Sequence, residues 1–246
     1  MTMTSLAGVA GSKAGPKSGD SGISIPDQLY NAVSTNTPVA CYYAHEDYLA
    51  LVSGEVSGIT DPWNSHDAAQ STAARRPHWD DTNELIIFDQ SNTEYMTLDF
   101  SSGVSSGPIT VVAVVDIKST APSLQCLFSF QTGLLYYMLD YQDEYTIYEN
   151  SWEKMGSTVT GNQYLVFEHK AGEGNTEVRK DGVSLGTTMA TELAMGGGAG
   201  FGAANTWSTP ASHMDAEVKV AAVYSGVDAT DRAAIEVILS NLKDGM

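Results

Sequence analysis

The sequence predicts an all-β protein, an antiparallel jelly-roll β-sandwich of the concanavalin A-like type with an N-terminal arm and a short C-terminal helix. Short segments rich in β-branched, aromatic and leucine residues follow one another, and turn residues separate them. No helical segments alternate with these strands, which excludes a parallel α/β sheet. Only 17% of the 246 residues are charged, so Ser, Thr, Asn and Gln must supply much of the polar surface. Such a surface suits strands better than solvated helices.

The N-terminal part of the chain is predicted to be an arm. Residues 1 to about 25 are mostly Gly, Ser, Ala, Lys and Pro, a linker composition, and we place the end of the arm at residue 37. Residues 1–40 hold two lysines and two aspartates, so the net charge of −18 lies on residues 41–246. The arm lacks the charged and apolar regions of a signal peptide, and no run in the chain is long enough for a transmembrane helix.

The strands of the sandwich are predicted between residues 48 and 226. A tight hairpin is expected within TEVRKDGVSLGT, because the Asp-Gly pair at 181–182 readily adopts the positive φ angles of such a turn. A glycine-rich strand at 195–204 and a closing strand at 216–226 follow it. The earlier strands are YLALV (48–52), ELIIF (84–88), YMTLDF (95–100), ITVVAVVDI (109–117), LQCLFSF (124–130), LLYYMLDY (134–141), YTIYE (145–149) and QYLVFEH (163–169).

One helix is predicted, at the C-terminus, over DATDRAAIEVILSNLKDG. Asp228 or Thr230 can cap its N-terminus, and Asp231 interacts favourably with the helix dipole in the first turn. Lys243 and then Gly245 end it. Apolar residues at three- and four-residue spacing form one stripe, which we expect to pack against the sandwich. The stripe consists of Ile235, Ile238, Leu239 and Leu242.

Three stretches of the chain, at 56–100, 177–187 and 200–242, occur in a characteristic order. In the first, a tryptophan and a polar loop precede Ala-Ala-Gln, Arg-Pro and a strand ending in Phe-Asp-Gln-Ser-Asn. The second is the Asp-Gly hairpin, and the third ends in a strand with Tyr-Ser and a short helix. Together they resemble the laminin-G-like, concanavalin-A-like jelly-roll family, of the kind found in phage structural proteins. The resemblance implies one jelly-roll domain over residues 38–246.

Catalytic motifs are missing from the sequence. Glycosidases on this fold usually carry Glu-x-Asp-x-Glu on one strand, and that pattern is absent. The nearest carboxylates, Asp140, Asp143, Glu144 and Glu149, are divided between a turn and two faces. No phosphate loop, dinucleotide fingerprint or His-Glu-x-x-His occurs, and Gly-x-Ser-x-Gly is matched only by GVSSG (103–107), inside a Ser- and Gly-rich loop segment rather than between a strand and a helix. We therefore expect a protein that is not an enzyme and requires no cofactor.

Calcium is the metal for which the sequence offers candidate ligands. The resemblance implies calcium at the rim of the sandwich, held by Asp, Asn and backbone oxygens, which are the hard ligands that calcium prefers. The alternative is that these carboxylates are part of a generally acidic, solvated surface. The two cysteines, Cys41 and Cys126, are too few for a disulfide framework or a structural zinc site, and we favour two unpaired thiols. The candidate calcium ligands are Asp61, Asp67, Asp80 and Asp81.

A dense run of aromatic residues, YYMLDYQDEYTIYENSW (136–152), could bind a glycan. An exposed tyrosine or tryptophan ring can stack on the face of a pyranose ring. The alternative is that alternate rings fill the core and the others cover the edges of the sheet. The candidate glycan platform consists of Tyr141, Tyr145, Tyr148 and Trp152.

Two functions fit these features. The first is a virion structural protein, a phage capsid decoration protein at the virion surface, whose residues 1–37 bind capsid or other virion proteins and which forms a homo-oligomer within the assembly. The second is a carbohydrate-binding module of a host-adhesion fibre or of a bacterial surface protein, which recognises a cell-surface glycan. The acidic balance, 30 Asp and Glu against 12 Lys and Arg, argues against nucleic acid and an anionic membrane surface as partners.

Overall fold

The structure of this chain is a computed structural model, and it places most of the residues after the N-terminal segment. It describes residues 23–34, 38–100, 108–120, 124–130, 135–148, 152–170, 175–188, 198–204 and 210–246.

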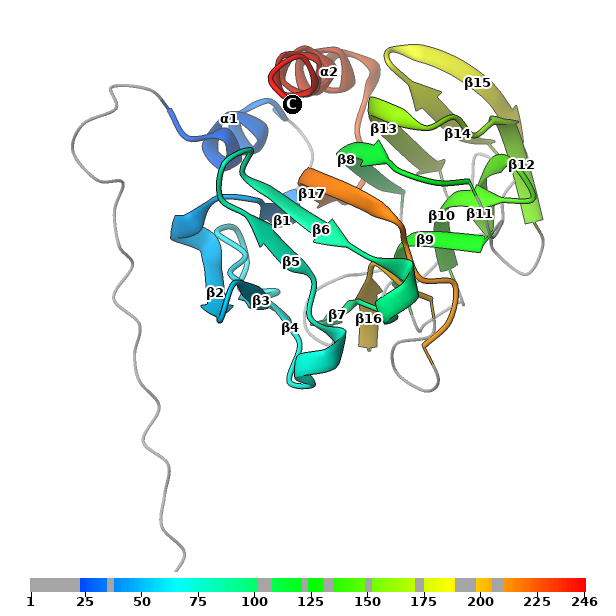
Figure 1. The fold of residues 1–246 in the computed structure, drawn as a ribbon. Helices are drawn as coiled ribbons and strands as arrows, with labels where there is room; N and C mark the ends of the chain where they lie inside the picture. The colour runs from blue at the N-terminus through cyan, green and yellow to red at the C-terminus, as the bar shows by residue number, and fades with distance from the viewer. Residues whose placement is uncertain are drawn as a thin grey trace, which may run out of the picture.

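Antiparallel strands form two sheets that pack face to face, which confirms the predicted β-sandwich (Figure 1). We call them the helix-covered sheet and the second sheet. In the helix-covered sheet, β1 (Pro38–Tyr43) and β6 (Leu85–Phe88) both pair with one edge of β17 (Ala216–Tyr224). On the other edge of β17 the strand order is β8 (Ile109–Ile117), β13 (Gly161–Lys170), β14 (Asn175–Lys180) and β15 (Val183–Thr188). The second sheet contains β4 (Ala68–Ala69), β7 (Met96–Asp99), β16 (Gly198–Phe201), β9 (Leu124–Phe130), β10 (Leu135–Tyr141), β11 (Glu144–Tyr148) and β12 (Trp152–Ser157).

Three further strands connect the two sheets at one side of the sandwich. β3 (Glu55–Ile59) pairs with β2 (Leu49–Val52), with β4 of the second sheet and with β5 (His78–Asp80), and β5 pairs with β6. The hydrogen-bonded ladder therefore runs from one sheet into the other. Three short 3₁₀ segments lie in the connections: η1 (Glu46–Tyr48), η2 (Ala73–Arg75) and η3 (Gln90–Asn92).

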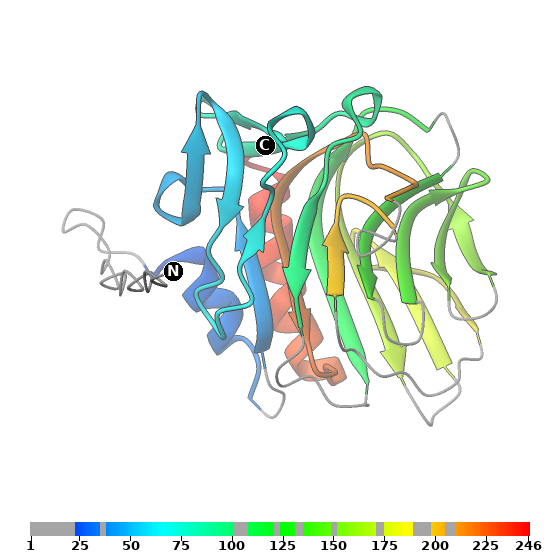
Figure 2. The ribbon, with the colours of Figure 1, turned by 90° about the horizontal axis from the view of Figure 1, so that it is seen from below.

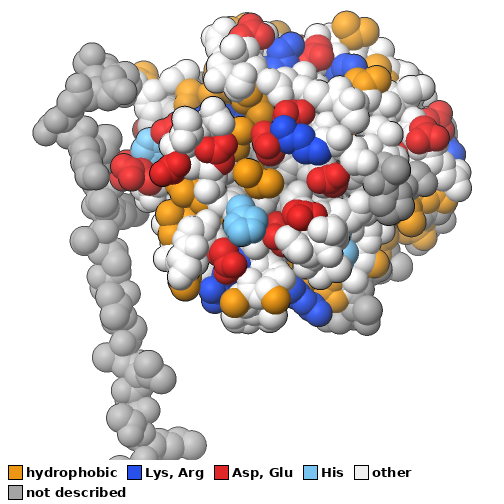
Figure 3. All heavy atoms as spheres, in the orientation of Figure 1, with side chains coloured by type: hydrophobic (Ala, Val, Ile, Leu, Met, Phe, Trp, Pro, Cys, Tyr) orange, Lys and Arg blue, Asp and Glu red, His pale blue; other side chains and the backbone are white. Residues whose placement is uncertain are grey.

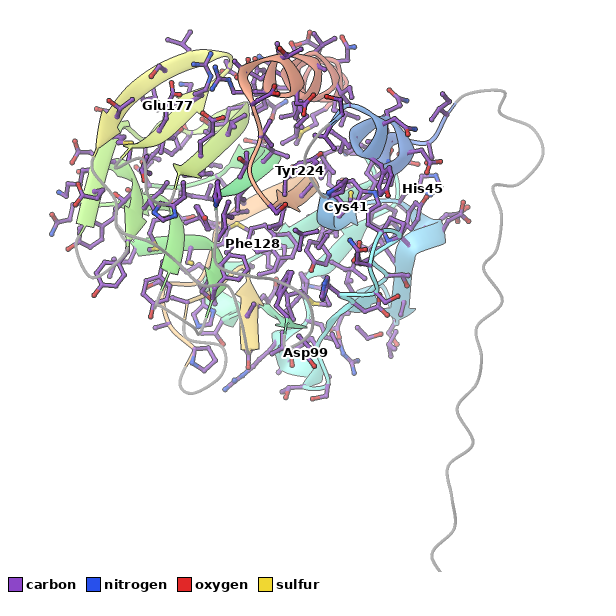
Figure 4. All side chains as sticks on the ribbon, turned by 180° about the vertical axis from the view of Figure 1, so that it is seen from behind. Cys41, His45, Asp99, Phe128, Glu177 and Tyr224 are labelled. Carbon is purple, nitrogen blue, oxygen red and sulfur yellow. The ribbon has the colours of Figure 1, made fainter. Side chains whose placement is uncertain are left out.

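Aromatic side chains fill the space between the sheets. The Phe128 and Phe201 rings stack with centroids 4.9 Å apart, and Tyr42 stacks on Phe201 from the opposite sheet at 5.7 Å; Figure 4 labels Phe128 in this interior. Gly202 follows directly, with φ +86°, and a Cβ there would lie 2.5 Å from the Phe88 ring. Only glycine fits that backbone conformation and that close approach.

Two helices cover the outer face of the helix-covered sheet (Figures 1 and 2). α2 (Ala229–Lys243) is the predicted C-terminal helix, and the Asp228 carboxylate caps it by accepting the N–H groups of Thr230 and Asp231. Ile235 and Leu239 are buried against the sheet, as the apolar stripe predicts. Neither of the described helices is long and apolar enough to cross a membrane.

Ion pairs hold α2 above β13 and β14. Arg232 on the helix lies 2.7 Å from the Glu168 carboxylate, which is almost fully buried, and 3.6 Å from Glu177. Arg179 of β14 pairs with Glu236 of the helix at 2.8 Å and with Glu177 at 3.0 Å. Figure 4 labels Glu177 on the strands beside α2. Sequence patterns predicted the apolar stripe of α2 but not these ion pairs beside it.

The second helix, α1 (Ile25–Asn31), falls within the predicted arm but packs on the sandwich. The Trp63 indole N–H donates to the Pro26 carbonyl at 3.1 Å, and the Tyr224 hydroxyl donates to the Leu29 carbonyl at 3.3 Å. Residues 24–34 therefore belong to the folded domain, which corrects the boundary expected after residue 37. Residues 1–22 of the arm lie outside the described residues.

Among the described residues, three two-residue hairpin turns use positive φ angles, and one of them is Ser53-Gly54 between β2 and β3, with φ +56° and +84°. Asp181 and Gly182 have φ +49° and +78°, as the Asp-Gly pair predicts. The turn between β10 and β11 uses Gln142 and Asp143 with φ +53° and +65°, and no glycine signals it in the sequence.

Matched truncations test where the folded domain begins. Removal of residues 2–22 is expected to leave the melting temperature unchanged. Removal of residues 2–34 deletes α1, exposes Trp63 and Tyr224, and is expected to lower the free energy of unfolding by about 2–4 kcal/mol. Thermal and urea denaturation measure both. Equal stability of the two truncated proteins would contradict the assignment of α1 to the domain.

Candidate functional site

Asp61, the first candidate calcium ligand, is buried and fully engaged by the backbone. Its Oδ1 accepts the N–H groups of Cys41 and Trp63, and its Oδ2 accepts those of Asn64 and His66, each at 3.0 Å. Carboxylate oxygens that accept several backbone N–H groups are satisfied without a cation. The geometry therefore gives Asp61 a structural role that joins β1 to the turn after β3.

The other three candidate calcium ligands also stabilise turns. Asp67 accepts the backbone N–H of Asp61 at 2.8 Å. Asp80 accepts the side-chain amide of Asn83 at 2.7 Å, which together with backbone N–H groups holds the pKa of its carboxyl below the usual value. Asp81 lies in that same turn between β5 and β6, and accepts the Thr82 hydroxyl at 3.4 Å.

The structure therefore divides the candidate calcium ligands between two turns. Among the described residues, no three His, Cys, Asp or Glu side chains gather in an arrangement that could hold a metal ion. Calcium binding stays a prediction, and Asp61 is the residue with the least capacity for it. Both cysteines are buried and free, so they do not form a disulfide.

Tyr141 and Tyr148 of the candidate glycan platform lie on the outer face of the second sheet, away from the helices, and the side chain of Trp152 lies outside the described part of the structure. Tyr136 of β10 is the ladder partner of Tyr148 of β11, and the two rings stack with centroids 5.3 Å apart and 15° between their planes. Trp152 of β12 is in turn the ladder partner of Tyr148. Tyr141, at the end of β10, is half-buried and packs against the same cluster.

Tyr145, another predicted platform residue, lies on the opposite side of the sheet. Three positions separate it from Tyr148, and because side chains alternate along a strand, the two rings point in opposite directions. Tyr145 is fully buried in the core, its hydroxyl donates to the Gln163 side-chain carbonyl, and burial raises its pKa to about 12. It therefore cannot present a ring face to a ligand.

Polar side chains border the remaining tyrosines. The Lys154 ammonium lies 5.3 Å from the centroid of the Tyr141 ring, donates to the Gln142 side-chain carbonyl at 2.7 Å, and lies 3.3 Å from Glu144. Sequence reasoning missed the role of Lys154, although its register opposite Thr146 puts it on this face. We define the tyrosine face as Tyr136, Tyr141 and Tyr148 with Lys154 and Gln142.

Packing beneath the tyrosine face restrains its rings. Met138, Cys126 and Ala204 are buried and form one cluster with Tyr136, while Tyr141 and Tyr148 pack against it and remain half-exposed. A ring supported in this way loses little conformational entropy when a ligand binds.

Asp140 is a buried carboxyl beside this face. Its Oδ1 accepts the N–H of Asp143 at 3.0 Å and so stabilises the turn between β10 and β11. Its Oδ2 accepts no hydrogen bond from the part of the chain that the structure describes, and burial raises the pKa of the carboxyl to about 6.

A second aromatic cluster lies at the end of β1 on the helix-covered sheet. The Tyr43 and His45 rings stack at 5.8 Å, with Tyr48 edge-on to Tyr43 at 6.1 Å; Figure 4 labels His45. Tyr43 is only 9% exposed, and the Lys219 ammonium already lies 5.9 Å from the centre of its ring. Tyr136 of the tyrosine face is buried to the same degree, at 8% exposed, so the partly exposed rings are Tyr48 in this cluster and Tyr141 and Tyr148 in the tyrosine face.

Comparison with known proteins relates the chain to others by its fold. No protein-family model matches the chain, and no curated protein matches it in sequence. Among solved structures, it is similar to domain 4 of AbnA, a GH43 extracellular arabinanase from Geobacillus stearothermophilus, in complex with arabinotriose. That match has a TM-score of 0.55 and 13% identity, and covers 84% of this chain and 100% of that domain.

Two larger proteins contain a similar sandwich. Trypanosoma rangeli sialidase matches with a TM-score of 0.54 and 12% identity, over 88% of this chain. A structure of botulinum neurotoxin type C, whose cell entry depends on two ganglioside molecules, matches with a TM-score of 0.57 and 7% identity, over 84% of this chain. The matches cover only 38% of the sialidase chain and 51% of the neurotoxin chain. Identities this low establish the shared fold alone.

Replacement of Asp61 tests its structural role. Asp61→Ala leaves four backbone N–H groups without their acceptor, and we expect a loss on the order of 3–5 kcal/mol in the free energy of unfolding. Asp80→Ala, which removes a partly exposed turn carboxylate, is the control and should cost less than about 1 kcal/mol. Urea denaturation with and without EDTA measures both. Similar losses for the two variants would contradict the assigned role.

The buried Asp140 carboxyl predicts a pH-dependent stability. Its pKa is raised from 3.8 to about 6, so the proton stabilises the folded state. That stabilisation is present below about pH 4 and is lost as the pH rises through 6. Asp140→Asn cannot ionise, so its stability relative to wild type should be about 2 kcal/mol more favourable at pH 7 than at pH 4.

Buried His169 titrates in the same window with the opposite sign, because burial lowers its pKa to about 4. The comparison is therefore made between variant and wild type at each pH, by urea denaturation. Asp81→Asn, which replaces an exposed carboxylate in the turn between β5 and β6, is the control. A stability difference between Asp140→Asn and wild type that is the same at both pH values would rule out this role of Asp140.

Proposed function

We propose that this protein is a carbohydrate-binding domain without catalytic activity, and that the tyrosine face binds an oligosaccharide. The observation that carries the proposal is the supported tyrosine cluster, in which the stacked rings of Tyr136 and Tyr148 lie on the same sheet face as Tyr141. Binding sites of this kind combine aromatic surface with a few placed polar groups. Lys154 and Gln142 supply such groups at the edge of the rings.

The chemistry of the face suits a sugar. The C–H face of a pyranose or furanose ring packs on an aromatic ring, while its hydroxyl groups need donors and acceptors at the rim. Lys154 can donate, and the Gln142 side chain and the tyrosine hydroxyls can both donate and accept. The face therefore offers both kinds of contact within one sheet surface.

The fold neighbours support the same proposal by analogy. Domain 4 of AbnA is in complex with arabinotriose, and structures of the Trypanosoma rangeli sialidase hold sialic acid and related sugars. The neurotoxin interacts with gangliosides. Proteins that contain a sandwich of this shape thus bind glycans, although the match covers only part of the sialidase and the neurotoxin, a shared fold is an analogy, and the site must carry the function.

The carboxylates near the face favour binding over catalysis. Glu144 is paired with Lys154, and Asp140 is buried within the turn that it stabilises. Glycoside hydrolysis needs two carboxyl groups on either side of the scissile bond. Because Glu144 and Asp140 have other roles, we propose a binding domain.

The virion-surface function remains a prediction. It depends on residues 1–37, of which 1–22 lie outside the described residues, and the neighbouring folds lend it no support. A homo-oligomer and capsid partners are predictions of the same kind. A host-binding component of a particle could also carry the tyrosine face, so the two functions are compatible.

Replacement of Tyr148 tests the proposed function. A glycan array first identifies the sugar that binds most tightly, with arabinotriose and sialyllactose included. Tyr148→Ala should then weaken its binding at least tenfold, about 1.4 kcal/mol, in isothermal titration calorimetry. Tyr30→Ala, at a tyrosine that is 47% exposed on α1, is the matched control and should bind like wild type. Unchanged affinity in a folded Tyr148→Ala protein would refute the proposal.

A further inference from the structure

We propose that the tyrosine face selects uncharged oligosaccharides and discriminates against acidic ones. This inference rests on the proposed function and names the ligand class of the same site. It follows from the charges around the face rather than from the rings themselves.

The whole molecule repels anions. Its formal net charge is −18, and Figure 3 shows acidic side chains spread over a face with few basic ones. Proteins recognise carboxylate groups with arginine or lysine side chains that are free to pair with them. Most of the basic side chains of the described residues already have carboxylate partners. These are Arg76, Lys118, Lys154, Arg179, Lys219, Arg232 and Lys243.

The same holds at the tyrosine face itself. Lys154 is the cation of this face, and Glu144 and Gln142 already occupy its ammonium at 3.3 Å and 2.7 Å. Asp143, exposed in the adjacent turn, adds a further negative charge. The carboxylate of an acidic sugar would have to compete with Glu144 for Lys154 while it approaches Glu144 and Asp143.

An uncharged sugar is not repelled by Glu144 and Asp143. Its hydroxyl groups can accept from Lys154 and exchange hydrogen bonds with Gln142 while the ion pair with Glu144 stays intact. The rings of Tyr141 and Tyr148 are neutral and give up little hydration. The charges therefore exclude one class of glycan and leave the other unaffected.

The inference separates the fold neighbours into two groups. Sialic acid and gangliosides that contain it carry carboxylates, whereas arabinotriose carries no charge. The proposed ligand of this chain resembles the second kind. The side chains around the tyrosine face, and not the shared fold, determine whether a charged or an uncharged glycan binds.

Matched sugars test the inference on the full-length protein. Titration calorimetry compares lactose with 3′-sialyllactose, and a neutral galactose trimer with the galacturonic acid trimer, at 50 and 500 mM NaCl. We expect the neutral member of a bound pair to bind at least tenfold more tightly at low salt, and the ratio to shrink at high salt. Equal or tighter binding of the acidic member would overturn the inference while leaving the proposed function intact.

Binding of neither member of any pair, with no other glycan bound on the array, would overturn the proposed function and the inference together. Glu144→Gln then tests the local mechanism, because it removes one negative charge and releases Lys154. We expect it to raise the affinity for the acidic member relative to the neutral one at least threefold.

Glu217→Gln is the matched control for net charge. Glu217 lies on the helix-covered sheet, where it pairs with Lys118 at 2.9 Å, and its replacement changes the total charge by the same amount. The acidic-to-neutral ratio should stay at the wild-type value in Glu217→Gln. Equal shifts in the two variants, or no shift in Glu144→Gln, would overturn the role assigned to the charges at the face.

Discussion

The buried carboxylate of Asp61 is the interaction on which the rest of the structure depends. It accepts one backbone N–H from Cys41 in β1 and three from the turn after β3, so it joins two parts of the chain twenty residues apart. That turn carries Trp63, whose ring packs on Tyr224 at 5.4 Å and whose N–H donates to α1. A single side chain thus fixes β1, the turn and the helix above them. Burial of this carboxyl group is compensated because each of its oxygens accepts two backbone N–H groups.

This arrangement determines which surface is left for function. α1 and α2 cover the helix-covered sheet, and the ion pairs of Arg232 and Arg179 seal the border of α2. Much of the aromatic and apolar surface of that sheet is therefore used for stability. The second sheet has no helix of the described structure above it, and Tyr141 and Tyr148 remain half-exposed on its outer face. The candidate site follows from this asymmetry between the sheets.

Apolar residues at alternate positions predicted the strands, and apolar residues at three- and four-residue spacing predicted α2. An element that is buried on one side repeats its apolar residues with the period of that element. α1 escaped notice because seven residues with one fully buried leucine, Leu29, give no such trace. Tyr145 was placed on the wrong face, although its odd spacing from Tyr148 contained the answer. The structural role of Asp61 could not be predicted, because a sequence shows a carboxylate but not the backbone N–H groups that fold around it.

The composition and the candidate site are consistent for a physical reason. A chain with 30 acidic and 12 basic residues has few cations to spare, and in the folded domain those cations neutralise buried or crowded carboxylates such as Glu168. To bind an acidic ligand, a basic side chain would have to break its ion pair with one of these carboxylates. Aromatic rings carry no such cost, and rings packed on Met138 and Cys126 are already ordered before a ligand arrives. A protein of this charge gains affinity most readily from rings and hydroxyl groups, which is the chemistry of the tyrosine face.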